Sequence, residues 1–549
     1  MFCNKKNVNL LTALLQTHSI HHIVICPGSR NAVLAHNFNE GRFTLHPVTD
    51  ERSAGFVALG LIAATSQPVA VCVTSGSAVL GLHPAVAEAQ ERHLPLLVIS
   101  ADRPACWIGQ LDGQTLPQPS AFAHLHIPHV QLPEIHDEQD AWWCRRLVRE
   151  ALTGMSKHEG GPAHINIPIS EPLFQFTTED LPQVRKASHY APASYRLPEE
   201  VVRNIEHARL PVVYIGQLTP AVSQALSHTD LLHHDGLLFL PDPLANVGNR
   251  FRAARLEMSA PLRQEFAPDL ILHLGGNVVH KQLKLRLRSL PHATAIRFGF
   301  DSHLVDTFQH DAYWVEMPTL QALEQLCSLR LNRKPEVVEW NRRLDQASSP
   351  ADLPLPFSDL YAMRHVLQRL PQETIVEVGN SRPVRSAAVW APHHGLALHC
   401  NRGVNGIEGS LSTAVGHALG CPKEMVVCLI GDLSFFYDLN ALWNVDLPRN
   451  LRIVLFNNGH GQIFDALPGL SASPALTRYI SATHHTSARG LAQSFGLTYL
   501  TAHDEASLQT ACSTLLQPQE RASLLEIFTP AGGNQQSWIQ LKQWFEQLG

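Results

Sequence analysis

The 549-residue chain has no apolar stretch approaching the roughly 20 residues that a membrane-spanning helix requires, so we expect no membrane span. It also has no excess of basic residues, because 42 Lys and Arg stand against 48 Asp and Glu, a net charge of −6. Proteins that bind nucleic acid or anionic lipid through a polycationic surface have the opposite balance. The charge balance therefore argues against both partners, and we expect no nucleic-acid partner.

The ten cysteines include no pair with the CxxC spacing of a zinc or redox site, and the 32 histidines form no HExxH motif. Cys26, Cys72 and Cys428 lie inside apolar runs, where a thiol packs as a small hydrophobic group. The N-terminus also lacks the small-residue cleavage site of a secretory signal. These absences predict no zinc site and indicate a protein of the reducing cytoplasm.

Short runs that are apolar at nearly every position alternate with helical patterns along the whole chain. Such runs are typical of parallel strands whose sheet is covered by helices on both faces. We therefore predict an α/β protein with three domains, each containing a mainly parallel sheet flanked by helices. The runs are 23–28, 45–50, 68–76, 95–104 and 164–169 in the first third, 210–216, 237–242, 270–276 and 295–301 in the middle, and 374–380, 396–403, 425–432, 451–458 and 524–529 in the last.

Two proline-containing stretches without clear periodicity, 181–200 and 331–359, are expected to be linkers. The predicted domains are accordingly 1–180, 200–335 and 355–549. Gly, Asp, Asn or Ser follows many of the predicted strands, and open α/β sheets bind ligands at the carboxyl ends of their strands. No GxGxxG motif follows any of these strands, which argues against a dinucleotide-dependent dehydrogenase.

The strongest local signal is GDLS at 431–434, followed one helix and one strand later by FNNGHGQIF at 456–464. Asp432 and Asn458 would each stand at a strand end. A carboxylate, an amide oxygen and the backbone carbonyl of His460 are hard ligands suited to octahedral Mg²⁺. Such a set leaves positions for two phosphate oxygens and a water, so it would anchor a diphosphate. Taken alone, however, such a pair of motifs is more often only two turn signals.

The spacing and flanks of these two motifs resemble the metal and diphosphate motif of thiamine diphosphate-dependent enzymes. Leu433 replaces the second glycine of the usual GDG, but GDLS followed by YDLNAL is similar to the 2-succinyl-5-enolpyruvyl-6-hydroxy-3-cyclohexene-1-carboxylate synthase (MenD) family. The resemblance covers nearly the whole chain and is weakest in the middle domain. The other motifs that carry it are PGSRN (27–31), TDERSAGF (49–56), TSGSA (74–78), SADRP (100–104), DGQTLPQP (112–119), CNRGVNGIEGSLSTAVG (400–416) and GQIF (461–464).

The resemblance implies a thiamine diphosphate-binding fold, with a pyrimidine-binding domain, a middle domain and a diphosphate-binding domain that holds Mg²⁺ or Mn²⁺. It implies that Glu51 and Asn405 contact the aminopyrimidine, that Ile407 lies beneath the cofactor, and that Ile463 and Phe464 form an apolar wall. The residues implied around the diphosphate and the metal ion are Gly431, Asp432, Leu433, Ser434, Asn458 and His460.

Glu51 has two interpretations. Without a family context, a first-turn carboxylate that complements the helix dipole is the simpler one. In the resembled family, the matching glutamate hydrogen-bonds N1′ of the aminopyrimidine and promotes the imino tautomer that removes the C2 proton. A buried carboxyl beside an aromatic base can stay protonated for such work. We therefore expect Glu51 to be catalytic, and the resemblance adds Gln114 and Ser381 to the catalytic set.

The resemblance also implies the reaction, which is decarboxylation of 2-oxoglutarate and 1,4-addition of the succinyl carbanion equivalent to isochorismate in menaquinone biosynthesis. Both substrates carry two carboxylates, and the planar fork of arginine binds a carboxylate bidentately. Gln282 stands where some family members have an arginine, which puts the second isochorismate contact in doubt. Family positions nominate Ser29, Arg30, Arg103 and Lys281 for isochorismate, and Ser381, Arg385 and Arg402 for the oxoglutarate-derived part.

Two rival interpretations have to be weighed. One is another thiamine diphosphate enzyme, such as an acetolactate synthase or a simple 2-oxo acid decarboxylase, and SADRP, NRGVNGIEG and GDLS argue against it. The other is a cofactor-binding protein without catalysis, which the presence of Glu51 argues against. Because family members pair the first and last domains across subunits, we expect a homodimer or homotetramer with active sites at the subunit interface.

Overall fold

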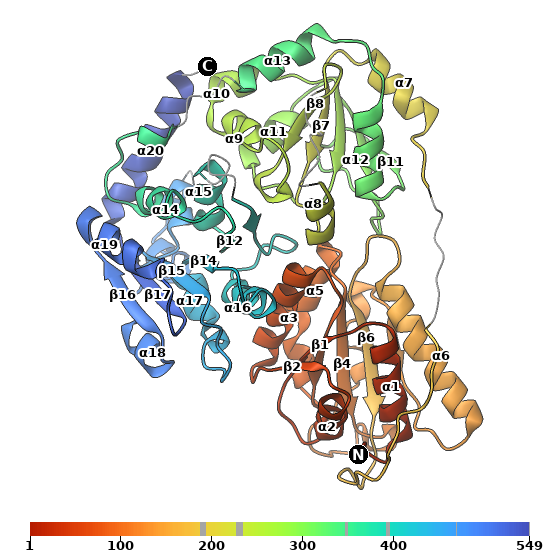
Figure 1. The fold of residues 1–549 in the computed structure, drawn as a ribbon. Helices are drawn as coiled ribbons and strands as arrows, with labels where there is room; N and C mark the ends of the chain where they lie inside the picture. Colours follow the sequence, from red (N-terminus) through yellow and green to blue (C-terminus); the bar gives the residue numbers. More distant parts are fainter. Residues whose placement is uncertain (187–193, 227–233, 346–349, 391–395, 468, 548–549) are drawn as a thin grey trace. The chain divides into compact units, whose positions relative to one another are not determined.

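The computed structural model describes residues 1–186, 194–226, 234–345, 350–390, 396–467 and 469–547. It contains three mainly parallel sheets of six, five and six strands, each flanked by helices (Figure 1). The predicted fold class is therefore confirmed. The chain divides into two compact units. Unit 1 is Met1–Ala191, Gly403–Lys423 and Phe436–Leu451, and unit 2 is Pro192–Arg402, Glu424–Phe435 and Arg452–Gly549.

Unit 1 contains the first sheet. Its strands are β1 (His22–Ile25), β2 (Thr44–Pro47), β3 (Val69–Val73), β4 (Leu96–Asp102), β5 (His129–Gln131) and β6 (Ala163–Pro168), and its main helices are α1 (Lys6–Thr17), α2 (Ala32–Glu40), α3 (Glu51–Thr65), α4 (Ala78–Gly81), α5 (His83–Glu91), α6 (Glu138–Met155) and α16 (Ser410–Gly420). The strand order is β2-β1-β3-β4-β6-β5, and every pairing is parallel. In Figure 1, α1 and α6 lie on one side of this sheet and α3 and α5 on the other, which is why its central strands are buried throughout.

Helix α16 joins unit 1 by packing its backbone directly against α3. A Cβ atom added to Gly60 would lie 2.0 Å from the carbonyl oxygen of Thr413, and one added to Gly416 would lie 2.0 Å from the carbonyl oxygen of Val57. Both distances are far below van der Waals contact, so only glycine fits at these two positions. The segment that follows Arg402 is thereby placed in unit 1, although it lies far along the chain from the first sheet.

Unit 2 contains the second sheet, with strands β7 (Pro211–Ile215), β8 (Leu238–Pro241), β9 (Leu270–Leu274), β10 (Thr294–Phe298) and β11 (Tyr313–Val315) in the parallel order β11-β10-β9-β7-β8. Its helices are α7 (Glu199–His207), α8 (Pro220–Leu226), α9 (Phe251–Met258), α10 (Ala260–Glu265), α11 (Lys281–Arg288), α12 (Thr319–Ser328) and α13 (Pro335–Asp345). Helix α13 lies inside the stretch 331–359 that we expected to be a linker, and it packs into the core beneath this sheet through Val337, Trp340 and Leu344. That expectation was therefore wrong for α13. Part of the other expected linker, 187–193, lies outside the described residues, as does 346–349.

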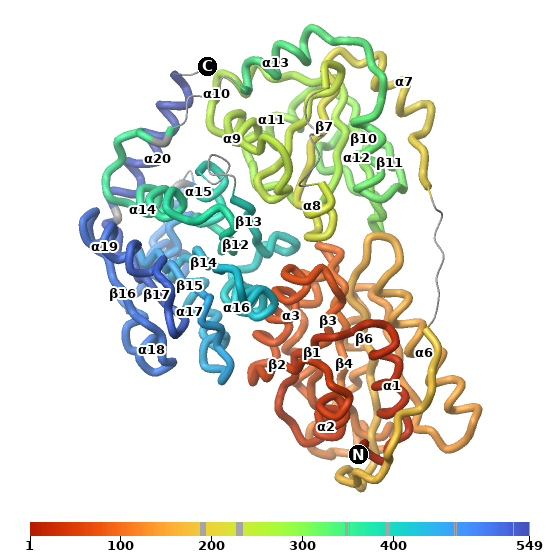
Figure 2. The backbone as a smooth tube through the Cα atoms, in the orientation of Figure 1, coloured from red at the N-terminus to blue at the C-terminus, as the bar shows by residue number. Residues whose placement is uncertain are grey.

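The third sheet also belongs to unit 2, and Figure 2 follows it from β13 to β16. Its strands are β12 (Ile375–Val378), β13 (Leu398–His399), β14 (Val426–Gly431), β15 (Leu451–Asn457), β16 (Thr498–Ala502) and β17 (Ser523–Phe528), and its helices are α14 (Asp359–Leu367), α15 (Arg382–Trp390), α17 (Asp432–Tyr437), α18 (Arg489–Ser494), α19 (Glu505–Leu515) and α20 (Ala531–Gln547). The order β13-β12-β14-β15-β17-β16 places the ends of β13, β12, β14 and β15 next to one another. In the part of the chain that the structure describes, none of the helices combines the length and apolarity needed to cross a bilayer.

His164 on β6 makes the stability of unit 1 depend on pH. The imidazole is fully buried, its Nε2 lies 2.7 Å from Ser100 Oγ, and its Nδ1 has no hydrogen-bond partner. Burial, together with the charge of His129, lowers the pKa of His164 to about 3. Since the unfolded chain has a pKa of about 6.5, acid protonates the unfolded state first. The stability associated with neutral His164 is therefore complete above about pH 6.5 and is lost as the pH falls toward 3.

We expect wild-type unit 1 to lose about 2 kcal/mol more than a His164→Gln variant when the pH is lowered from 7.5 to 5. Glutamine keeps a group that can bond Ser100 but does not titrate. The measurement is the opening free energy of the β4 and β6 amides by hydrogen exchange at the two pH values. Comparing each protein with itself removes any constant cost of the substitution. Equal losses in the two proteins would contradict a buried neutral His164.

Candidate functional site

The residues that the sequence nominates fall into two groups, one in each unit. Unit 1 carries Ser29, Arg30, Glu51, Arg103, Gln114, Asn405 and Ile407, and unit 2 carries Lys281, Ser381, Arg385, Arg402, Gly431, Asp432, Leu433, Ser434, Asn458, His460, Ile463 and Phe464. In both units most of them follow the carboxyl ends of neighbouring parallel strands, where open α/β sheets bind ligands.

In unit 1 these strands are β2, β1, β3 and β4, in that order across the sheet. Glu51 follows β2, Ser29 and Arg30 follow β1, and Arg103 follows β4. Gln114 reaches the same edge, because a Cβ atom on Gly76, after β3, would lie only 3.1 Å from the Gln114 Cα atom. The structure thus brings these five predicted residues to one edge of the first sheet.

Glu51 is the first residue of α3, but it does not cap the helix. The N-cap is Asp50, whose carboxylate accepts hydrogen bonds from the backbone N–H groups of Arg52 (2.8 Å) and Ser53 (3.3 Å). Glu51 is half-buried, and burial, followed by the charge of Asp50, raises the pKa of its carboxyl. Because Asp50 caps the helix, the carboxyl of Glu51 does not have to. With its raised pKa, this carboxyl is available for proton transfer.

The two arginines of unit 1 that the sequence nominates for isochorismate are already held by neighbouring groups. Arg30 is 5% exposed, donates to the carbonyl oxygen of Ile169 (2.9 Å) and lies 3.1 Å from a carboxylate oxygen of Glu171. Arg103 donates to the carbonyl oxygen of Gly113 (2.8 Å) and pairs with Asp112 at 3.1 Å. Because the guanidinium group has five N–H donors, these contacts fix each arginine without using all of its donors.

Asn405 and Ile407 lie on the loop that precedes α16. The carboxylate of Glu88 anchors the start of this loop by accepting hydrogen bonds from the backbone N–H groups of Gly403 (2.9 Å) and Val404 (2.8 Å). Asn405 has a positive φ of 64°, and the side chain of Ile407 is 40% exposed. Ile407 is therefore not part of the hydrophobic core in this structure.

In unit 2 the two motifs around Asp432 and Asn458 meet, as their spacing predicts. Asp432 follows β14 and is 3% exposed, and its two carboxylate oxygens accept hydrogen bonds from the backbone N–H groups of Leu433 (2.7 Å) and Gly459 (2.8 Å). The Gly459 bond ties the loop after β15 to the end of β14. Nε2 of His484 lies 3.4 Å from the same carboxylate, a neighbour that the sequence analysis missed.

These residues present oxygen atoms that fit a divalent cation. The amide nitrogen of Asn458 donates to Asp359 (2.8 Å), so its oxygen is turned the other way. The imidazole of His460 faces Asp465 at 2.8 Å, whereas its backbone carbonyl accepts one hydrogen bond from Gln462 (2.9 Å) and keeps a second lone pair. Burial raises the pKa of Asp432, which indicates a carboxylate in need of a countercharge. A carboxylate, an amide oxygen and a carbonyl are the ligand types that Mg²⁺ prefers.

The departure from the usual GDG motif is accommodated locally. Leu433 is the second residue of α17. A Cβ atom on Gly461 would lie 3.3 Å from the Cδ1 atom of Leu433 and 3.0 Å from the ring of Phe464. Glycine at 461 therefore leaves room for Leu433 and Phe464 side by side. Ser434 is buried in α17, and Ile463 and Phe464 are half-buried in the short helix η8 (Gln462–Ala466).

The predicted carboxylate-binding cations of unit 2 lie together. Arg402 follows β13, is 8% exposed, donates to the side-chain oxygen of Asn380 (3.1 Å) and has an Nε atom without a hydrogen-bond partner. Arg385 in α15 donates to the carbonyl oxygen of Ser381 (2.5 Å), whose φ is +73°. Burial and the positive charge of Arg402 lower the pKa of Arg385. Such a repulsive cluster of cations suits an anionic ligand.

Sequence reasoning missed Lys284 in this cluster. Lys281 and Gln282, at the start of α11, are exposed, whereas Lys284 is half-buried one turn further on. Burial lowers the pKa of Lys284, and the charges of Arg288, Arg402 and Lys281 lower it further. The sequence did contain a signal for Lys284. Residues three apart in a helix lie on the same face, so Lys284 is a neighbour of Lys281.

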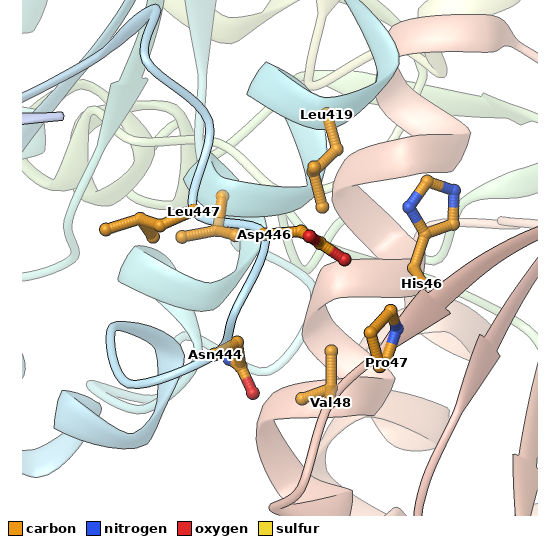
Figure 3. A pocket seen from close by; sticks show the side chains of 8 residues that line it. His46, Pro47, Val48, Leu419, Asn444, Asp446 and Leu447 are labelled. Carbon is orange, nitrogen blue, oxygen red and sulfur yellow. The ribbon is translucent and has the colours of Figure 1, made fainter. Parts of the chain in front are cut away.

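Unit 1 also contains a pocket that other residues line (Figure 3). It is lined by His46 and Val48 near the end of β2, Val415 and Leu419 of α16, and Asp446 among others, and the side chain of Asp446 points toward the strand that carries His46. Burial and the neighbouring His22 lower the pKa of His46 to about 4, so the imidazole is neutral at pH 7. None of the predicted site residues lines this pocket, and we assign it no ligand.

The sequence matches two protein families, the thiamine pyrophosphate enzyme N-terminal TPP binding domain over residues 6–124 and the C-terminal TPP binding domain over residues 378–527. It is similar to the 2-succinyl-5-enolpyruvyl-6-hydroxy-3-cyclohexene-1-carboxylate synthase of Bacteroides thetaiotaomicron, at 42% identity over 560 residues with all of both chains covered. Proteins of the same name from Bacteroides fragilis and Phocaeicola vulgatus are 40% and 41% identical and cover 100% and 96% of each chain. The two matched domains contain Glu51 and Asp432, respectively.

Proposed function

Because this chain belongs to the 2-succinyl-5-enolpyruvyl-6-hydroxy-3-cyclohexene-1-carboxylate synthase (SEPHCHC synthase) family of thiamine diphosphate enzymes, we propose that it decarboxylates 2-oxoglutarate and adds the remaining succinyl group to isochorismate. The products are SEPHCHC and CO₂, and the reaction belongs to menaquinone biosynthesis. The observation that carries this proposal is the 42% identity over the full length of a relative with that name. Thiamine diphosphate, when bound, supplies the carbon nucleophile that attacks the 2-oxo acid.

The metal ion in this proposal is Mg²⁺ or Mn²⁺. Asp432, the amide oxygen of Asn458 and the carbonyl oxygen of His460 would hold it. The burial of Asp432 and the hydrogen bonds that orient Asp432 and Asn458 support that assignment. Gly431, Leu433 and Ser434 would lie along the diphosphate. Asn405, Ile407, Ile463 and Phe464 would hold the rings and exclude water from them.

Glu51 would hold a proton and share it with N1′ of the aminopyrimidine. Its raised pKa and its freedom from helix capping support this role. A carboxyl whose pKa is raised by burial keeps its proton to a higher pH than an exposed one, and this favours donating the proton and taking it back within one turnover. Gln114, at the same sheet edge, would lie beside the reacting groups.

The carboxylates of the two substrates would be bound by the cationic residues. Ser381, Arg385 and Arg402 would take the oxoglutarate-derived part, and the unpartnered Nε atom of Arg402 supports a ligand there. The residues proposed for isochorismate are Ser29, Arg30, Arg103 and Lys281. The chain would act as a homodimer or homotetramer, as the pairing of domains across subunits in the resembled family implies. The cysteines without CxxC spacing support a place in the reducing cytoplasm.

The proposal is tested by the ultraviolet absorbance of isochorismate when the purified protein is mixed with 2-oxoglutarate, thiamine diphosphate and Mg²⁺. We expect the absorbance to fall only when all components are present, and not when pyruvate replaces 2-oxoglutarate. If the absorbance stays constant while CO₂ is released from another 2-oxo acid, the cofactor assignment stands and the substrates are wrong. If neither change occurs with folded protein, the catalytic proposal fails.

A further inference from the structure

Asp359 is a buried carboxylate in contact with Asn458, and none of the motifs in the sequence contains it. It is the first residue of α14 and is 8% exposed. Its Oδ2 atom accepts a hydrogen bond from the amide nitrogen of Asn458 at 2.8 Å, although 99 residues separate the two in the chain. Its Oδ1 atom accepts a hydrogen bond from the hydroxyl group of Thr529 at 2.5 Å. Each carboxylate oxygen therefore has its own donor.

This arrangement determines which way the amide of Asn458 faces. An ionised carboxylate only accepts hydrogen bonds, so the amide must turn its NH₂ group toward Asp359. The opposite orientation would place two acceptor oxygens against each other in a buried place, with no proton between them. The amide oxygen consequently faces away from Asp359, and it accepts a hydrogen bond from the backbone N–H of His460 at 3.3 Å.

Asp359 is itself held in place by the end of β17 and by α20. Thr529 directly follows β17, the neighbour of β15 in the third sheet. Asn534 in α20 donates to the hydroxyl oxygen of Thr529 (3.3 Å), so the hydroxyl proton is left to point at Asp359. The side-chain oxygen of Asn534 also accepts a hydrogen bond from the backbone N–H of Asp359 (2.6 Å). These contacts fix the carboxylate in position independently of Asn458.

We propose that Asp359 is a positioning residue that keeps the amide oxygen of Asn458 available to the divalent cation. The inference rests on the proposed function, which places that cation at Asp432, Asn458 and His460. Partners of a metal ligand commonly orient the ligand in this way, and losing one weakens metal binding by about 10- to 100-fold. Asp359 touches neither substrate nor cofactor in this role and acts only through Asn458.

The test uses the isosteric variant Asp359→Asn in the full-length protein. The hydroxyl group of Thr529 still donates, so it holds the oxygen of the new amide and turns the NH₂ group toward Asn458. The amide of Asn458 then has to reverse and offer NH₂ to the cation. We expect the Mg²⁺ affinity, measured by calorimetric titration at a fixed thiamine diphosphate concentration, to fall by about 10- to 100-fold.

Thr529→Val is the matched control, because it removes a hydrogen bond from the same carboxylate without touching Asn458. We expect it to lower the thermal stability of the protein while leaving the Mg²⁺ affinity near that of wild type. The double variant Asp359→Asn with Thr529→Val has no hydroxyl group at 529 to fix the amide of residue 359. The amide of Asn458 is then not forced to reverse, so part of the lost Mg²⁺ affinity should return. A double variant as weak as Asp359→Asn alone would assign the effect to the lost charge and overturn the orientation argument.

Two further outcomes separate the inference from the proposed function. If Asp432→Ala weakens Mg²⁺ binding but Asp359→Asn does not, the metal site stands and the positioning role is wrong. If neither variant changes Mg²⁺ binding in folded protein, the metal assignment itself fails, and the role of Asp359 fails with it. Thermal unfolding of each variant without cofactor shows whether the protein is folded before the titration is interpreted.

Discussion

Replacing Glu51 with glutamine should leave thiamine diphosphate binding close to that of wild type and lower turnover by roughly 10² to 10⁴-fold. Glutamine has the size of glutamate and can still donate a hydrogen bond, but it cannot release and recover a proton at neutral pH. In the structure, burial and the charge of Asp50 raise the pKa of Glu51, which favours the protonated carboxyl that this role needs. The effect should therefore appear in turnover rather than in affinity.

The measurement is turnover of isochorismate and 2-oxoglutarate at saturating cofactor, with cofactor affinity titrated separately. Asp50→Asn is the matched control, since it removes a carboxylate from the same helix end while asparagine still caps α3. We expect this control to lose far less turnover than Glu51→Gln, because burial, the largest cause of the raised pKa of Glu51, is unchanged when the charge of Asp50 is removed. Near-normal turnover in Glu51→Gln would return Glu51 to the simpler interpretation of a first-turn carboxylate that stabilises the helix.

The central strands were predictable because burial on both faces produces a continuous apolar run. Strands β3, β4, β7 and β9 are buried at every position, and each coincides with a predicted run. Among the strands of the described residues, three were missed, namely β5, β11 and β16, and each is the last strand at one edge of its sheet. Their faces are partly exposed, so their sequences lack the continuous apolar pattern on which the prediction depended.

The meeting of Asp432 and Asn458 was predictable for a similar reason. Each residue directly follows a strand, and adjacent parallel strands bring their carboxyl ends to one edge of the sheet. Asp359 could not be found in this way. It begins a helix and reaches Asn458 only through the packing of α14 and β17 around the third sheet. No spacing or local motif encodes a contact of that kind.

The roles of the individual residues depended on the resemblance rather than on pattern. An arginine in a sequence is usually a solvated surface residue. The structure changes that expectation for Arg402, which is 8% exposed and carries an unpartnered donor atom. The structure also identifies Lys284, a half-buried cation near Arg402 and Lys281. Lys284 adds a positive charge to this region, whereas Gln282 does not. Burial and proximity are properties of the folded chain, and sequence spacing alone does not contain them.

Asp432→Ala should weaken the binding of Mg²⁺ and of thiamine diphosphate together. Asp432 offers the only charged group among the three proposed ligands, and the diphosphate would be held largely through the metal ion. The loss should be larger than the about 10- to 100-fold typical of a residue that only orients a ligand. The measurement is a titration of thiamine diphosphate at several fixed Mg²⁺ concentrations, and of Mg²⁺ at fixed cofactor.

The linkage between the two ligands provides the sharper criterion. Because coupled ligands strengthen each other by the same factor, raising the Mg²⁺ concentration should restore part of the thiamine diphosphate affinity in Asp432→Ala. Asp438→Asn is a suitable control, since Asp438 is a fully buried carboxylate that accepts hydrogen bonds from the backbone N–H (2.7 Å) and hydroxyl (2.8 Å) of Ser412 and has no proposed ligand. We expect this control to lower stability and leave both affinities near wild type. Unchanged affinities in folded Asp432→Ala would refute the assignment of Asp432 as a metal ligand.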